Sequence, residues 1–294
     1  MIAVALINYL IEKEIEVVAI CRPNSSKLRN VPKHKLVKII ECDIIDLISL
    51  KDNITENYDA FFHFAWNGTF GNSRNDSYLQ NMNIKYTLDA LNLANHLGCK
   101  VFVGAGSQAE YGRVEGDLSS TTPINPENGY GIAKYTAGKL SAIYAKQLNI
   151  KHVWARILSV YGPNDNNFTM IMSTIEKLLN GERASFTKGE QEWDYLYCDD
   201  AAKALYLMAL KGKDQAVYPL GSGIHRPLSE YITILKEEIP KECEIGLGDI
   251  PYSENQVMYL CADISELTKD TGFVPKISFR EGIKKTIQYK QNSL

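Results

Sequence analysis

The chain has 294 residues, of which 45% are hydrophobic and 23% charged, and its formal net charge is −3. These values are typical of a globular protein with one large or two modest domains, and they argue against a polyanionic partner such as nucleic acid. No apolar run reaches the roughly 18 residues of a membrane span, and the N-terminal apolar stretch lacks the basic segment of a signal peptide. The six cysteines are scattered, which predicts free thiols in a reducing cytoplasm and no metal site.

The first elements along the chain are a helix and a strand. Apolar residues at helical spacing predict a helix over residues 2–12, and the branched residues of 16–20 predict a strand. No capping residue precedes Ile2. Because a helix that leads into a buried strand normally follows a strand, we expect an element to be missing upstream of this one.

Strand and helix signals then alternate through the first half. Further strands are predicted at 35–40, 60–65, 101–105 and 152–157, and helices at 81–97 and 130–148. This alternation predicts an α/β fold with a doubly wound parallel sheet, whose strand-end loops line one cleft. After Gly162-Pro163 the elements shorten. We therefore expect a dinucleotide-binding domain over 1–162 and a smaller, mainly substrate-binding lobe over 163–294, with segments that return to the first domain.

The strongest chemical signal is a tyrosine and a lysine in one predicted helix. Tyr130 and Lys134 are four residues apart and share a helix face. An ammonium near a phenol favours the phenolate and lowers the tyrosine pKa, and such a phenol can act as a general acid or base. The pair alone is weak evidence, because a packed tyrosine beside a solvated lysine has the same spacing. Ser107, directly after a predicted buried strand, adds a hydroxyl at the cleft end.

The motifs occur in an order that resembles one family over nearly the whole chain. They are "FFHFAW", "GAGSQAEYG", "YGIAK", "RILSVYGP", "WDYLYCDDAA", "YPLGSG" and "CADISELTKDTGFVPKISFREGI". Together they resemble the extended short-chain dehydrogenase/reductase family, in its NAD(P)-dependent epimerase/dehydratase branch that acts on nucleotide sugars. The resemblance implies a Rossmann-type fold, a homodimer, and a catalytic triad of Ser107, Tyr130 and Lys134. Tyr130 would be the acid/base, Lys134 would also hold the nicotinamide ribose, and Ser107 would orient the substrate oxygen.

The same resemblance accounts for the start of the sequence. Family members begin with a strand and a Gly-x-x-Gly-x-x-Gly turn that approaches the cofactor pyrophosphate. Here Ala3 takes the place of the third glycine, and strand 1 and the first two glycines are absent. We expect a gap in the sheet where that strand belongs.

Several positions bear on the cofactor. Relatives that use NAD carry an acid where Cys21 stands, whereas Arg22, helped by a nearby serine or by Lys27, would suit a 2′-phosphate. NADP is therefore favoured over NAD, although a solvated loop arginine is an equally good interpretation of Arg22. The resemblance also assigns cofactor contacts to the following residues: Asp43, Ile44, Phe64, Ala65, Trp66 and Leu158. Trp66 is bulky for its place and has core packing as its alternative, and His63 is expected to be a packed strand residue.

The substrate positions depart from the family pattern. Dehydratases follow the triad hydroxyl with Asp-Glu, whereas Ser107 is followed by Gln108-Ala109, which disfavours dehydration. The expected substrate contacts are Ser107, Gln108, Ser159, Asn167, Trp193 and Arg226. Trp193 has core packing as its alternative, Arg183 or Lys188 are alternatives to Arg226 as the phosphate-binding cation, and Asp199 and Asp200 are expected to be structural.

Two functions remain open at this point. The first is an enzyme acting at C4 of a nucleotide sugar, either a 4-epimerase or a 4-keto-6-deoxysugar reductase. The alternative is a non-catalytic relative that serves as a sensor or scaffold, which the missing glycine turn favours and the intact triad opposes. The apolar residues on the helices 81–97 and 130–148, among them Leu91, Ala137 and Ile143, predict the dimer surface.

Overall fold

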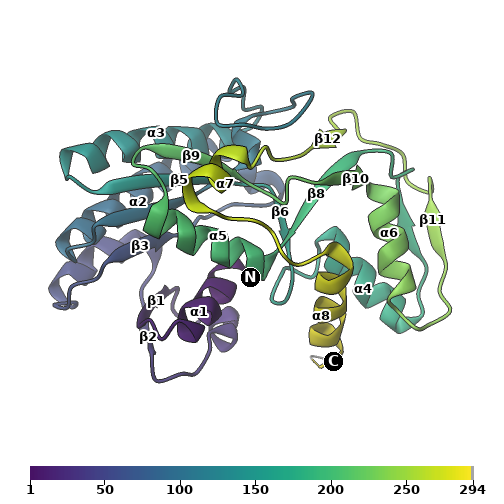
Figure 1. Cartoon of the computed structure of the whole chain (residues 1–294), viewed down its shortest axis with the longest axis horizontal. Helices are drawn as coiled ribbons and strands as arrows, with labels where there is room; N and C mark the ends of the chain where they lie inside the picture. Colours follow the sequence, from purple (N-terminus) through teal and green to yellow (C-terminus); the bar gives the residue numbers. More distant parts are fainter. Residues whose placement is uncertain (293–294) are drawn as a thin grey trace.

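The structure is a computed structural model that describes residues 1–292. The chain folds into two lobes that lie side by side, with the α/β sheet lobe on the left of Figure 1 and the smaller lobe on the right. The predicted α/β class with a parallel sheet is confirmed.

The main sheet has the order β3-β4-β5-β9, and all of its strands are parallel. Its strands are β3 (Ala60–His63), β4 (Val101–Ser107), β5 (Lys151–Ile157) and β9 (Ala216–Leu220). β4 and β5 pair along their whole length, from Val101↔Lys151 to Ser107↔Ile157. Because the strands are parallel, their carboxyl ends meet at one edge, where Ser107 lies.

Helices cover both faces of this sheet, as Figure 1 shows. α2 (Ser77–His96) and α3 (Gly129–Gln147) pack against one another over the side chain of Phe102. α5 (Cys198–Lys211) packs over Val101 and Val103 on the other face, beside α1 (Ile2–Glu12). The period of two along a strand sends alternate side chains to the two helix layers, so both faces of β4 are buried.

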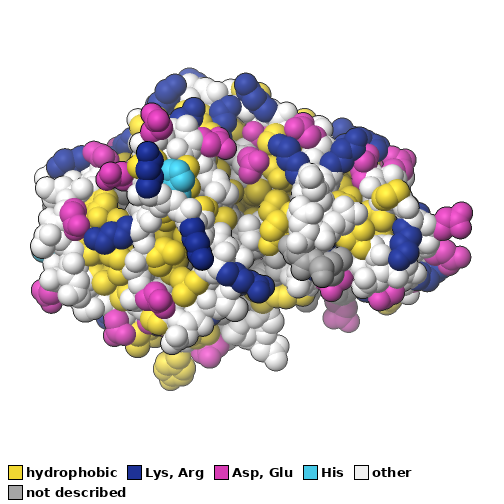
Figure 2. All heavy atoms as spheres, turned by 90° about the horizontal axis from the view of Figure 1, so that it is seen from below, with side chains coloured by type: hydrophobic (Ala, Val, Ile, Leu, Met, Phe, Trp, Pro, Cys, Tyr) yellow, Lys and Arg dark blue, Asp and Glu magenta, His cyan; other side chains and the backbone are white. Residues whose placement is uncertain are grey.

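The first two strands form a separate sheet. β1 (Val17–Cys21) pairs in parallel with β2 (Val37–Glu41), and within residues 1–292 neither joins β3. β3 in turn pairs only with β4. One edge of β1 and one edge of β3 therefore carry no strand partner, and Figure 2 shows hydrophobic side chains exposed on this half of the underside.

The predicted elements match with shifted ends. α1 spans Ile2–Glu12 as expected, and its N-cap Met1 makes no side-chain capping bond. α2 begins a turn earlier than predicted, because the Asp76 side chain accepts a hydrogen bond from the Leu79 amide (3.0 Å) and caps it there. β4 runs on to Ser107, since β5 continues to pair with it.

The smaller lobe is built from short strands and helices. It contains β6 (Ser159–Tyr161), α4 (Met170–Asn180), β7 (Ala184–Phe186), β8 (Glu192–Tyr197), β10 (His225–Pro227), α6 (Leu228–Glu237), β11 (Ile245–Leu247), β12 (Tyr259–Leu260) and α8 (Phe279–Gln291). β8 pairs with β6, β10 and β12, and α7 (Ser265–Thr271) packs on α5 in the first lobe. Asp200 accepts hydrogen bonds from the amides of Lys276 and Ile277 (2.8 Å each), so it holds the returning chain, as expected for a structural acid.

Two whole-chain features complete the fold. Among the described helices, none is both long and apolar enough to cross a membrane. All six cysteines are free thiols, and Cys99, Cys198 and Cys261 are buried.

A glycine-lined slot brings α3 close to the sheet. The indole of Trp154, 2% exposed, lies between β4 and α3. A Cβ at Gly104, Gly106 or Gly138 would come within 2.2, 2.3 or 2.7 Å of that indole, respectively. Real Cβ atoms do not approach so closely, so all three positions require glycine for packing reasons.

We predict that Gly138→Ala destabilises the protein by about 1–3 kcal/mol, the usual range for overpacking a core. Alanine in place of glycine within a helix normally stabilises a protein by about 0.5–1 kcal/mol. A decrease in the free energy of unfolding would therefore indicate the close contact with Trp154. Urea unfolding measures the change. In a Trp154→Leu background the same substitution is expected to lose its penalty. A Gly138→Ala variant at least as stable as the wild type contradicts the packing argument.

Candidate functional site

Ser107 ends β4 at the carboxyl edge of the sheet and begins a short 3₁₀ turn, η4 (Gln108–Glu110). Its hydroxyl oxygen accepts a hydrogen bond from the Ala109 amide (3.2 Å), and its own amide donates to Glu110 Oε1 (2.8 Å). These two bonds form a capping box. The hydroxyl is therefore fixed at the strand end rather than mobile in a loop.

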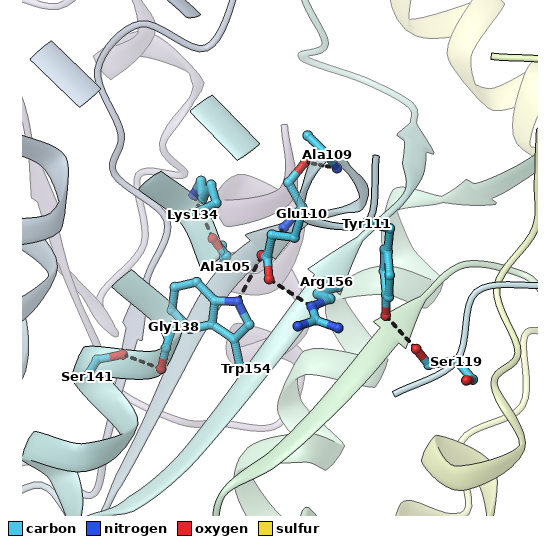
Figure 3. Close-up of polar contacts among 11 residues, drawn as sticks. Ala105, Ala109, Glu110, Tyr111, Ser119, Lys134, Gly138, Ser141, Trp154 and Arg156 are labelled. Atoms are coloured by element: carbon cyan, nitrogen blue, oxygen red, sulfur yellow. Dashed lines mark hydrogen bonds and ion pairs between the residues drawn. The ribbon is translucent and has the colours of Figure 1, made fainter. Parts of the chain in front are cut away.

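Glu110 is fully buried and links this turn to β5 (Figure 3). Its carboxylate accepts hydrogen bonds from Trp154 Nε1 (3.0 Å) and from Arg156 Nε (2.7 Å), in addition to the Ser107 amide. The Arg156 guanidinium also lies over the Tyr111 ring, 4.6 Å from its centroid. With its oxygens occupied in this way, Glu110 is a structural anion, not a free acid/base group.

Tyr130 lies in the first turn of α3, whose N-cap Asn128 accepts a hydrogen bond from the Gly131 amide (2.9 Å). The Ser107 side chain lies close enough to the Tyr130 phenol to act on its pKa, which it lowers as a hydrogen-bonding neighbour. The structure thus brings together the hydroxyl after β4 and the phenol at the start of α3, as the sequence predicted.

Lys134 lies one turn further along α3 and is 4% exposed. Its Nζ donates a hydrogen bond to the Ala105 carbonyl (2.6 Å) and lies 3.8 Å from the centroid of the Trp66 ring. Burial lowers its pKa to about 7, with Glu110 opposing the shift. Burial thus disfavours the charged form of this lysine, whose polar partner is the Ala105 carbonyl.

The expected direction of the Tyr130 pKa is wrong. Burial raises that pKa, and the opposing effects come from the Ser107 hydrogen bond and from the charge of Arg74. The Lys134 ammonium is instead directed at the Ala105 carbonyl, and it is 5.8 Å from the centroid of the Tyr130 ring.

The loop after β3 forms the wall of the site next to Tyr130 and Lys134. Trp66 packs edge-on against Tyr130, with 6.0 Å between ring centroids and 81° between ring planes. Its indole N–H donates to Gln80 Oε1 (2.9 Å), and Asn83 holds the backbone of Asn67 with two further hydrogen bonds. Trp66 is thus half-buried at the site rather than part of the core. His63, by contrast, is buried with a pKa lowered by burial to about 3, so it is a neutral packed residue, as expected.

Two features of the first lobe bear on the binding of a dinucleotide cofactor. The first turn of α1, which includes Ala3, has no side-chain cap, so its amides are available to an anionic group at the helix N-terminus. At the end of β1, Arg22 is exposed and makes no hydrogen bond or ion pair with a described residue. An uncapped helix N-terminus, together with an exposed guanidinium at the end of β1, fits a phosphate-bearing cofactor.

The other predicted cofactor residues lie at strand ends but have structural contacts of their own. Asp43 caps the 3₁₀ helix η2 (Ile44–Asp52) by accepting from the Ile45 amide (3.2 Å). Phe64 packs on the hydrophobic core, Ala65 is exposed, and Leu158 is buried. Lys27, expected to help with a 2′-phosphate, donates to Asn166 Oδ1 of the second lobe (2.8 Å).

Three of the predicted substrate residues lie together in the smaller lobe, because Trp193 bonds to Ser159 and pairs with Arg226 across β8 and β10. Trp193 Nε1 donates to Ser159 Oγ (2.8 Å) while its ring packs on the core, so these two residues support one another. The Asn167 side chain accepts from Lys290 (3.1 Å). Gln108 is half-buried in the turn beside Ser107.

The candidate cations for a substrate phosphate have different partners. Arg226 lines a shallow pocket between α6 and α8 and lies 4.0 Å from Glu230. Arg183 is paired with Glu244 and Asp249 (2.7 and 3.0 Å). Asp194, next to Trp193, is fully buried and accepts hydrogen bonds from the backbone of the 222–223 turn and of Ala262, which gives it a structural role.

Sequence reasoning missed Arg74, Gln80 and Asn83. Arg74, in the 3₁₀ turn η3 (Gly71–Asn75), lies with its guanidinium 4.4 Å from the centroid of the Tyr130 ring. Its loop position gives no periodic signal. Gln80 and Asn83 are polar residues three apart on the buried face of α2, and such a pair can be recognised in a helix whose neighbours are apolar. Among residues 1–292, no three acidic, histidine or cysteine side chains converge to hold a metal ion.

Comparison with known proteins agrees with this geometry. The chain matches the NAD dependent epimerase/dehydratase family over residues 1–221. It is 28% identical to the UDP-glucuronate 4-epimerase of Thermodesulfobacterium geofontis over 91% of this chain and 84% of that protein. The UDP-glucose 4-epimerase of Thermotoga maritima, whose structure contains UDP-glucose, superposes with a TM-score of 0.88 at 25% identity, over 100% of this chain and 96% of that chain. The UDP-N-acetylglucosamine 4-epimerase of Methanobrevibacter ruminantium, in complex with UDP-N-acetylmuramic acid, has the same fold, with a TM-score of 0.90 at 22% identity over 100% and 96% of the two chains.

We predict that the buried Lys134 makes folding stability rise with pH above neutrality. Between a pKa of about 7 in the folded chain and the ordinary value of 10.5, the unfolded chain binds more protons than the folded chain. The free energy of unfolding therefore rises with pH in this window, by at most about 1.4 kcal/mol per pH unit from this group. Urea unfolding from pH 6 to 9 should show a steeper rise for the wild type than for Lys134→Met. Lys139→Met, which removes an exposed lysine of the same helix, should keep the wild-type slope. Parallel curves for the wild type and Lys134→Met contradict the prediction.

Proposed function

Because the chain belongs to the NAD dependent epimerase/dehydratase family, we propose that it is an NAD(P)-dependent enzyme acting at C4 of a nucleotide sugar. The reaction is that of a 4-epimerase or a 4-keto-6-deoxysugar reductase. The observation that carries the proposal is the closeness of the Ser107 hydroxyl to the Tyr130 phenol, with Lys134 on the next turn of the same helix. A sensor or scaffold needs no such arrangement.

The roles of the three residues follow from their positions. Tyr130 exchanges a proton with the C4 oxygen, accepting it as the carbonyl forms and returning it as the alcohol is restored. Ser107, fixed at the end of β4 by its capping box, donates a hydrogen bond to the same oxygen. Lys134 holds the nicotinamide ribose through its Nζ. NAD(P), when bound, supplies the hydride acceptor and donor.

Dehydration is disfavoured by the chemistry after Ser107. Water elimination needs a free acid and a free base near the sugar. The turn offers Gln108, which does not ionise, and Glu110, whose carboxylate is buried and bonded to Trp154 and Arg156. The site therefore suits proton exchange at one oxygen better than loss of water.

We predict that Tyr130→Phe lowers turnover about 10²–10⁴-fold, the usual contribution of a general acid/base. Cofactor binding should stay near the wild-type value, because the phenol acts on the substrate oxygen. Turnover is measured on UDP-glucose and related nucleotide sugars, and the dissociation constant by NAD(P)H fluorescence. Near-wild-type turnover of the variant contradicts the role given to Tyr130.

NADP is the proposed cofactor because Arg22 is a free, exposed guanidinium at the end of β1 and no acid precedes it. We predict that Arg22→Ala weakens NADP binding about tenfold, since a hydrogen bond to a charged group contributes about 1.5–3 kcal/mol, and that it leaves NAD binding unchanged. Arg29→Ala removes an exposed arginine from the neighbouring turn η1 (Ser26–Asn30) and serves as the matched control. A wild type that prefers NAD, or an Arg22→Ala variant with unchanged NADP affinity, contradicts this assignment.

The proposal includes two features of assembly. Ile132, Leu140 and Ile143 are 52%, 41% and 60% exposed on one face of α3, which suits a two-fold contact in a homodimer measurable by light scattering. Leu91 and Ala137, also among the apolar residues of these helices, are fully buried and belong to the faces that cover the sheet. Among residues 1–292, one edge of β1 and one edge of β3 have no strand partner, so they could accept one further parallel strand.

A further inference from the structure

The phenol ring of Tyr130 lies against a cation that no sequence motif indicates. The guanidinium carbon of Arg74 is 4.4 Å from the ring centroid, closer than the Lys134 Nζ at 5.8 Å. Arg74 forms no ion pair with a described residue, so no carboxylate of that part of the chain neutralises it. Its only hydrogen bond among these residues goes to the Thr69 carbonyl (3.2 Å).

The position of Arg74 is built into the fold. The next residue, Asn75, accepts a hydrogen bond from the Gly129 amide (3.0 Å), which joins η3 to the first residue of α3. A Cβ at residue 129 would lie 2.9 Å from the Arg74 carbonyl oxygen, so glycine lets the two backbones approach this closely. Arg74 is thereby held over the residue that follows Gly129 in the helix, which is Tyr130.

The other ionisable groups around the phenol add little positive charge. From α3, Lys134 has a pKa of about 7 and donates to Ala105. From β3, His63 is neutral, with a pKa near 3. From η4, Glu110 opposes ionisation of the phenol, and its partner Arg156 on β5 is held in a buried ion pair with it. Within the described residues, Arg74 is the permanently charged cation in contact with the ring.

We infer that Arg74 is a positioning residue that stabilises the phenolate of Tyr130 and so sets the pH range in which Tyr130 accepts a proton. The inference rests on the proposed function and deepens it. A cation on the face of an aromatic ring is attracted to it, and the attraction grows when the ring carries negative charge. In this chain Arg74 thus takes the electrostatic role that the spacing of Tyr130 and Lys134 suggested for the lysine.

The test measures the ionisation of Tyr130 directly. A difluorotyrosine, which ionises nearer neutral pH than tyrosine, is placed at position 130 and titrated by fluorine NMR, which needs no substrate. Three variants are compared with the wild type: Arg74→Gln, which keeps a donor for the Thr69 carbonyl but removes the charge; Arg74→Lys, which keeps the charge; and Arg113→Gln, which removes an exposed arginine paired with Glu127. Thermal unfolding confirms that each variant is folded.

The expected result is a rise of about 0.5–1 pKa unit in Arg74→Gln, which corresponds to a loss of about threefold to tenfold in kcat/KM below that pKa. Arg74→Lys should recover most of the shift, and Arg113→Gln should show none. An unchanged pKa in Arg74→Gln, or equal shifts in the glutamine and lysine variants, overturns the inference. If Arg74→Gln fails to fold, the comparison of Arg74→Lys with the wild type decides. Because lysine keeps the positive charge, a Tyr130 pKa that rises in Arg74→Lys by the amount expected for Arg74→Gln contradicts a charge effect. A shifted pKa in a protein that turns over no nucleotide sugar keeps the inference and rejects the proposed function.

Discussion

The site depends on one buried ion pair, between Glu110 and Arg156. Both residues are at most 3% exposed, and their bond joins the turn after β4 to the neighbouring strand β5. Removing two charges from water is costly, and loss of one partner of such a pair typically costs about 3–5 kcal/mol. The Ser107 amide donates to the same carboxylate, so the position of the Ser107 hydroxyl is tied to this pair. The Ser107 hydroxyl, although it lies at a strand end, is therefore positioned by buried contacts in the way that a core side chain is.

The unusual environment of Lys134 follows from how closely α3 approaches the sheet. Gly138 gives α3 room to pack on Trp154, and Lys134 lies one turn before it on the same helix face. The ammonium therefore lies next to β4, where it contacts the Ala105 carbonyl, and it also contacts the Trp66 ring. The lowered pKa of this lysine is thus a consequence of glycine packing on the strand side of the helix.

The sequence predicted the elements that depend on local pattern. α1 follows from apolar spacing, the parallel sheet from alternating strands and helices, and the meeting of Ser107 with Tyr130 from strand-end geometry. It failed for the sign of the Tyr130 pKa shift, because that sign depends on burial and on where the lysine ammonium points. Arg74 was missed for a related reason, since its contact with Tyr130 is made by a loop that is anchored to two helices distant in the sequence.

The loop between β3 and α2 concentrates the features that set this site apart. It supplies Trp66 and Arg74, which both contact Tyr130, and it also supplies Phe70, whose ring lies 4.6 Å from that of Phe168 in the second lobe. Gln80 and Asn75 fix the loop to α2 and α3. β4 and α3 provide Ser107, Tyr130 and Lys134, whereas this loop provides the side chains that contact Tyr130. A change within the loop would therefore alter the proton affinity of Tyr130 while leaving the three motif residues in place. The chemistry of the site can therefore be tuned without touching the residues by which its family is recognised.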